Sequence, residues 1–106
     1  MGAGIGGSSG TASVAIALAA SGQVVAGVAG KRIRVFAWAV VSRLATDVKL
    51  QSNTTDITGA LPFAANGGVV WPGGMTPWCV TAKGEALNLN MTVNTAVNGV
   101  LVYDLV

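Results

Sequence analysis

Apolar and polar residues alternate most strictly near the end of the chain. From Leu87 to Val93 every second residue is apolar, and asparagine or threonine lies between them. This two-residue period is typical of a strand with one buried face, because successive side chains of a strand point to opposite sides. Asn98-Gly99, the dipeptide most common in tight hairpin turns, comes next. The pattern predicts a strand at 87–94, a hairpin turn at Asn98-Gly99 and a final strand at 100–106.

Residues 11–19 also alternate, with Val14, Ile16 and Leu18 on one face and serine or alanine on the other. The pattern favours a strand, and the alanines leave a short helix as the alternative. The longest strand candidate is 31–42. If alternation were strict, one face of this strand would carry only small or β-branched side chains: Ile33, Val35, Ala37 and Ala39. The opposite face would change from basic to large apolar side chains: Arg32, Arg34, Phe36, Trp38 and Val40.

Turn-forming residues separate the strand candidates. "SNTTD" at 52–56, "NGG" at 66–68 and Lys83-Gly84 are typical of turns, and "PGGMTP" at 72–77 is typical of an irregular surface loop. Gly59 and Pro62 make 57–65 a bent edge strand. About eight or nine short strands result, which indicates an all-β fold, an antiparallel β-sandwich of jelly-roll-like type. We divide the chain into a flexible Gly/Ser-rich N-terminal arm at 1–20 and a sandwich domain at 21–106.

Charge is scarce. Six basic and four acidic residues make up 9% of the 106 residues, whereas 52% are hydrophobic. Such a chain folds readily but has few charges to keep it dissolved as a single particle. We therefore expect other protein to cover much of its surface. A net charge of +2 is too small to indicate nucleic acid as a partner.

The residues needed for common catalytic sites are missing from the sequence. The chain has no histidine, which excludes Ser-His-Asp and Cys-His catalysis and histidine-ligated metals. Its one cysteine, Cys79, lies in an apolar run and is expected to be a buried, inert thiol. "GAGIGG" at 2–7 matches a dinucleotide-binding pattern by letter but follows no strand. We expect no enzyme activity, cofactor or metal.

The apolar stretch at 12–20 imitates a signal peptide without the positively charged residues that usually precede one. It is also about half as long as a membrane span. We therefore expect neither export nor membrane insertion.

An aromatic loop is the sharpest local feature. Trp71, Met75 and Trp78 surround Gly73-Gly74 in a segment that contains two prolines. Tryptophan suits three roles here: a plug for one end of the core, an anchor for a subunit or partner, or a platform for sugar rings. The sequence leaves the three open.

Three segments, "VAGKRIRVFAWAVVS", "DVKLQSNTTDITGALPFAANGGVVWP" and "GEALNLNMTVNTAVNGVLVYDLV", resemble small virion proteins of tailed bacteriophages. The resemblance covers residues 23–106 and concerns strands and turns rather than a catalytic signature. It implies a capsid decoration (cement) protein on the outer surface of the virion capsid, made in the host cytoplasm. The implied partners are the major capsid protein and further copies of the chain, in a homotrimer. The alternative is a receptor- or carbohydrate-binding module of a tail fibre.

The decoration hypothesis assigns roles to particular residues. The arm would dock on the shell through apolar side chains, namely Ile5, Val14, Ile16 and Leu18. Phe36 and Trp38 would contact another subunit, and Arg32 and Arg34 would bind carboxylates of the shell. Trp71, Met75 and Trp78 would form the candidate exposed binding loop.

Overall fold

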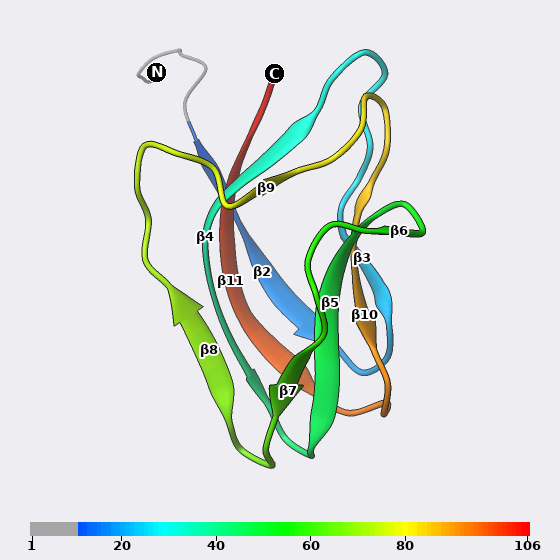
Figure 1. Ribbon diagram of the computed structural model, residues 1–106, viewed down its shortest axis with the longest axis vertical. Helices are drawn as coiled ribbons and strands as arrows, with labels where there is room; N and C mark the ends of the chain where they lie inside the picture. Colours follow the sequence, from blue (N-terminus) through cyan, green and yellow to red (C-terminus); the bar gives the residue numbers. More distant parts are fainter. Residues whose placement is uncertain (1–10) are drawn as a thin grey trace.

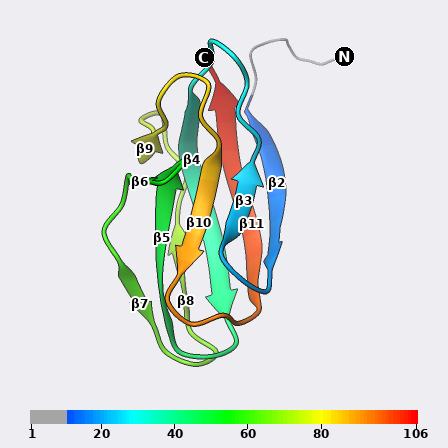
Figure 2. The ribbon, with the colours of Figure 1, turned by 90° about the vertical axis from the view of Figure 1, so that its right-hand side faces the viewer.

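Two antiparallel sheets pack face to face in the computed structural model, which describes residues 11–106 (Figure 1). The first, called the β2 sheet, has the strand order β2 (Ala12–Leu18), β11 (Val97–Leu105), β4 (Ile33–Ser42) and β8 (Gly68–Trp71), and β9 (Cys79–Val80) also pairs with β4. The second, called the β3 sheet, has the order β3 (Gly22–Val25), β10 (Leu87–Met91), β5 (Thr46–Ser52) and β6 (Thr55–Asp56), and β7 (Leu61–Phe63) also pairs with β5. Figure 1 shows the two layers next to each other, and Figure 2 looks onto the β3 sheet with the β2 sheet behind it. The prediction of an all-β antiparallel sandwich is confirmed.

The core lies between the sheets and is built from alternate residues of both. Its members are apolar and nearly inaccessible to solvent: Ile16, Val25, Ile33, Val35, Trp38, Val40, Val48, Leu50, Phe63, Leu87, Leu89, Met91, Val97 and Leu101. Burial of such side chains stabilises the fold by about 1.5–3 kcal/mol each. The strict alternation seen in β5 and β10 corresponds directly to their inward and outward faces.

Residues 12–18 belong to the sandwich rather than to an arm. They form β2, which pairs along its whole length with β11, from Ala12 opposite Tyr103 to Leu18 opposite Val97. Ile16 lies in the core. The helix alternative and the domain boundary at residue 20 are therefore wrong, because the apolar residues of this segment have a sheet partner and a core to fill. Ile5, assigned to docking, lies outside the described residues.

The predicted hairpin at the end of the chain is also wrong. β10 ends at Met91 and lies in the β3 sheet, whereas β11 lies in the β2 sheet, so residues 92–96 cross between the layers. Asn98-Gly99 lies inside β11, and Gly99 is opposite Val40 of β4. A Cβ atom at Gly99 would overlap the carbonyl oxygen of Ala39. Here glycine serves the close approach of two strands, not a turn.

A β-bulge changes which face of β4 is buried. Tyr103 of β11 is opposite Val35, and the residue before it, Val102, is opposite Ala37. Phe36 therefore has no residue opposite it in β11 and is the extra residue of the bulge. Ile33 and Val35 point into the core before the bulge, and Trp38 and Val40 after it. The prediction of a single uninterrupted face from Ile33 to Ala39 is therefore wrong beyond Val35.

Hydroxyl side chains hold the crossing segments at the ends of the sandwich. Buried Thr81 accepts a hydrogen bond from the Ile33 amide at 2.9 Å, and buried Thr46 accepts one from the Val93 amide at 3.0 Å. Ser52 accepts from the Ala82 amide at 2.9 Å and donates to the Glu85 carboxylate at 2.5 Å. The three bonds from the Ile33, Val93 and Ala82 amides each satisfy a backbone group that the sheets do not pair.

Candidate functional site

The outer face of the β3 sheet is polar. It carries Lys49 and Gln51 of β5 and Asn88 and Asn90 of β10, each partly exposed. Asp56 accepts hydrogen bonds from Lys49 at 3.0 Å and from Gln51 at 2.8 Å. The Gln51 amide, and after it the Lys49 ammonium, lower the pKa of Asp56. This face is that of an ordinary solvated sheet.

The outer face of the β2 sheet has an uncharged region, which begins beyond the Arg34–Asp104 ion pair at one end. Its residues, called the neutral face below, are exposed or half-buried: Ser13, Ala15, Ala17, Ala37, Ala39, Val41, Val70, Asn98, Val100 and Val102. The strand register aligns them in rows, one of which is Ala15, Val100, Ala39 and Val70. Val70 is 70% exposed. Large exposed apolar residues that are contiguous, rather than scattered, mark a surface that another molecule covers.

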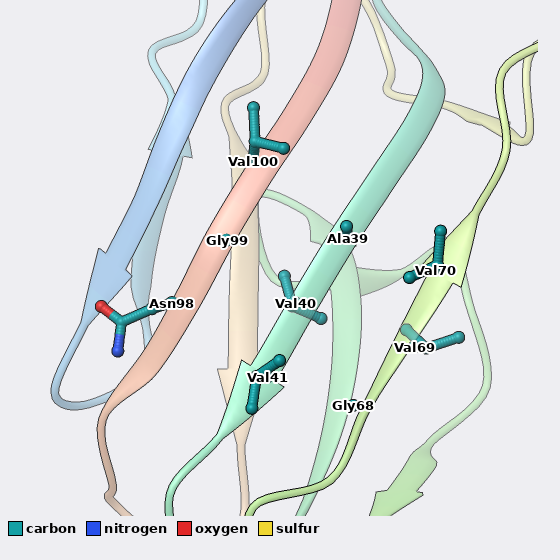
Figure 3. A pocket seen from close by; sticks show the side chains of 9 residues that line it. All are labelled: Ala39, Val40, Val41, Gly68, Val69, Val70, Asn98, Gly99 and Val100. Carbon is teal, nitrogen blue, oxygen red and sulfur yellow. The ribbon is translucent and has the colours of Figure 1, made fainter.

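A shallow groove of about 350 Å³ runs along this face between β11, β4 and β8 (Figure 3). Ala39 forms its floor, and Val100 and Val70 stand on the strands to either side. Gly99 and Gly68 bring those strands close to β4, since a Cβ atom at Gly68 would overlap the Val40 carbonyl oxygen. A second hollow, of about 190 Å³, continues the surface past Val102 to Pro72.

The aromatic loop lies beside the bulge of β4. β8 ends at Trp71 opposite Trp38, and β9 begins at Cys79 opposite Val35, so residues 72–78 leave the sheet between them. The predicted irregular loop is confirmed. The Trp78 amide donates a 2.6 Å hydrogen bond to the Val35 carbonyl, which fixes the returning end of the loop.

Three tryptophans form a row from the core to the surface. The ring centroids of Trp38 and Trp71 are 4.9 Å apart in an edge-to-face arrangement, and those of Trp71 and Trp78 are 4.8 Å apart in a stack. Trp38 is 2% exposed and Trp78 is 52% exposed. The row therefore closes one side of the core and also presents an aromatic ring to solvent. Met75 of the same loop is 98% exposed.

The residues assigned to docking and subunit contacts are not brought together at the surface. Ile16 and Trp38 lie in the core, so no surface contact through their side chains is available in this fold. Val14 and Leu18 are half-buried and pack against the core. Phe36 is half-buried at the bulge, with the Arg34 guanidinium 5.3 Å from its ring centroid. The assignments of Ile16 and Trp38 are wrong because the bulge and the pairing of β2 turn these side chains inward.

The two arginines differ in their availability. Arg34 donates two hydrogen bonds to Asp104, at 2.8 and 2.6 Å. The pKa of Arg34 is raised, chiefly by this bond. The guanidinium is thus already neutralised by a carboxylate at one end of the neutral face, contrary to the role assigned to it. Arg32 is exposed, and its side chain donates a hydrogen bond to the Thr81 carbonyl at 3.4 Å, its one side-chain hydrogen bond among residues 11–106.

Sequence reasoning missed the neutral face. The available signal was the loss of alternation at 36–41, where every residue is apolar. When both faces of a strand are apolar, one face packs on the core, and the other either is covered by a further element or is exposed to solvent. Within residues 11–106 no further strand or helix packs on this face, so it is the exposed apolar side.

The described residues contain no group of three or more histidine, cysteine, aspartate or glutamate side chains placed to hold a metal ion. Cys79 is half-buried, and burial raises the pKa of its thiol to about 11. Residues 11–106 include no helix with the length and hydropathy to cross a bilayer.

Comparison of the chain with protein-family models, with curated proteins and with solved structures gave no match.

Proposed function

We propose that this chain is a structural protein that attaches to other protein through the neutral face, and that it decorates a bacteriophage capsid. The uncharged, largely apolar face supports this function above all other features. Removing its valines and alanines from water on docking is favourable and leaves no charge to desolvate. Attachment across the joints between capsid subunits would stabilise the shell because the protein binds the assembled state preferentially.

The strand order supports the proposal at the level of the fold. Without the two-residue strands β6 and β9, the eight remaining strands run first-eighth-third-sixth in one sheet and second-seventh-fourth-fifth in the other. We assign this order to the jelly-roll type, which occurs in viral capsid domains and also in lectins and cupins. The fold alone does not distinguish these functions, whereas the uncharged apolar surface of the neutral face favours attachment to protein.

Co-sedimentation with expanded, DNA-free heads of the phage that encodes the chain tests the proposal. We expect the wild-type protein to sediment with the heads and to raise the temperature at which they break open. Val70→Asp places a charge in the neutral face and should weaken binding about tenfold or more. The matched control is Gln23→Asp, which adds the same charge to exposed Gln23 of the β3 sheet and should bind normally.

Two results would contradict the proposal. One is wild-type protein that stays in the supernatant at every concentration tested. The other is equal binding of both aspartate variants, which would exclude the neutral face as the attachment surface.

A sugar-binding module of a tail fibre is the second candidate, supported by exposed Trp78 stacked on Trp71. Titration with host surface polysaccharide should then give a saturable change in tryptophan fluorescence that Trp78→Ala abolishes. An unchanged spectrum at millimolar saccharide would reject it.

A further inference from the structure

Most sheet edges in this fold carry a feature that prevents pairing with another strand. β7 contains Pro62, and β6 carries Asp56, which is ion-paired with Lys49. β3 is only four residues long and begins with Gly22. The edge along β8 and β9 is interrupted by the 72–78 loop and its prolines. Proline, charge, shortness and interruption are the usual means of blocking edge-to-edge contact.

The remaining edge, along β2, has none of these features. Ala12–Leu18 has seven residues, none of them charged, proline or glycine. β11 occupies one side of β2, which lies at the edge of its sheet (Figure 2). No backbone hydrogen bond from another described segment reaches its other side. About half of its backbone amides and carbonyls therefore point away from the sheet without a protein partner in residues 11–106.

We propose that two copies of this chain pair along this edge, β2 antiparallel to β2, across a two-fold axis at Ala15. A two-fold axis makes the contact self-complementary and closes it at two chains. In this register Ala15 is opposite its own copy. Ser13 is then opposite Ala17, and Val14 is opposite Ile16.

The side chains fit this register on both faces. The outward pairs, Ala15–Ala15 and Ser13–Ala17, consist of small exposed residues that leave room for each other. The inward pair, Val14–Ile16, extends the apolar layer that these residues already form with the core. No charge of either sign enters the contact, so self-pairing brings no like charges together.

Pairing would join two β2 sheets into one sheet of eight main strands. Ala15 and Ala17 are part of the neutral face, so the two neutral faces would become one surface about twice as wide. A contact of seven residues per copy is narrow, and we expect association on the order of micromolar. The inference does not depend on what the neutral face binds.

Light scattering coupled to size-exclusion chromatography tests the proposal on the full chain. We expect the wild type to approach twice the 10.5 kDa chain mass as its concentration rises through the micromolar range. Ala15→Lys and Ala15→Glu, which each place two like charges at the axis, should remain monomeric. An equimolar mixture of the two variants should restore the dimer, because opposite charges then meet. Ala60→Lys is the matched control, in an exposed loop before β7, and should dimerise like the wild type.

Hydrogen exchange of the wild type provides a measurement without any substitution. Amide protection in residues 12–18 should rise with protein concentration, while protection in β7 should not change.

Four results would overturn the proposal. They are a wild type that stays monomeric at millimolar concentration, a trimer mass, a dimer that persists in Ala15→Lys, and a dimer that forms only after deletion of residues 2–10. The last would show that the preceding segment, rather than a second copy, occupies the edge.

Discussion

The surroundings of Cys79 set the pKa of its thiol and thereby its reactivity. Cys79 pairs with Val35 at the start of β9 and packs against the core, and burial raises the pKa of the thiol from its ordinary value of 9.0 to about 11. The thiolate is the reactive form, so the residue is almost wholly unreactive at neutral pH. This agrees with the inert role that the apolar run around Cys79 predicts.

We expect iodoacetamide at pH 8 to modify the folded protein much more slowly than the urea-unfolded chain. The thiol should also make the stability depend on pH. Because its folded pKa is raised, the unfolded chain releases its proton first, so stability is full below about pH 9 and falls as the pH rises toward 11. Urea unfolding at pH 7.5 and pH 10.5 measures the change.

Cys79→Ser is the control, since it removes the ionisable thiol and should flatten this part of the pH profile. Equal alkylation rates in the folded and unfolded states would contradict the expected burial.

At the scale of elements, close contact between strands depends on glycine. Gly99 of β11 and Gly68 of β8 each lie against a carbonyl of β4, on opposite sides of that strand. The three strands form the floor and sides of the groove. The geometry of the neutral face therefore depends on two positions where any side chain would force the strands apart.

Gly99→Ala should destabilise the fold by about 2–4 kcal/mol, because the new methyl group would overlap the Ala39 carbonyl. Gly74→Ala is the matched control. A Cβ atom at Gly74 meets nothing within 4 Å, so we expect a change below about 0.5 kcal/mol. Urea denaturation of both variants gives the comparison, and similar midpoints would refute this account of Gly99.

The sequence predicted elements wherever one physical cause dominated. Alternation predicts strands at 45–52 and 87–94, and the structure has β5 at Thr46–Ser52 and β10 at Leu87–Met91. Asn66, with a φ of 60°, lies in the turn predicted from "NGG". The prediction failed where a distant strand decided the outcome. Asn98-Gly99 has turn chemistry, but the approach of β4 makes Gly99 part of a strand. Similarly, no local signal reveals that Phe36 is the extra residue of a bulge, because the bulge is defined by the register of β4 against β11, a distant strand.

The candidate site was less predictable than the fold. Trp71, Met75 and Trp78 were identified, and the structure shows that one tryptophan row both closes the core and reaches the surface. The neutral face was not identified, since it needs residues from four strands whose order alternation cannot give. Trp38 was placed outside because strict alternation was carried through the bulge.

At the scale of the whole molecule, charge and apolar surface are segregated. The Lys49–Asp56 pair lies on the β3 sheet, the Arg34–Asp104 pair lies at one end of the β2 sheet, and the neutral face beyond it has no charge. With a net charge of +2, repulsion between molecules is weak. The neutral face therefore controls how the free protein behaves in concentrated solution.

Val70→Asp should raise the ammonium sulfate concentration needed to precipitate the protein, because it interrupts the exposed apolar surface. The variant lowers the net charge by one unit, and so does Gln23→Asp. A gain in solubility with Val70→Asp alone would show that position matters more than net charge. An equal gain in both variants would argue against a special role for the neutral face.

The pairing of β2 with β11 has a consequence for biosynthesis. Ala12 is opposite Tyr103, and β11 is the strand that joins β2 to β4. A nascent chain cannot assemble the centre of this sheet until residue 105 has left the ribosome, so the backbone amides and carbonyls of β2 and β4 that face β11 are unpaired until then. Formation of this sheet is therefore dominated by contacts between distant parts of the chain, and loss of residues 97–105 would remove the strand on which both neighbours depend.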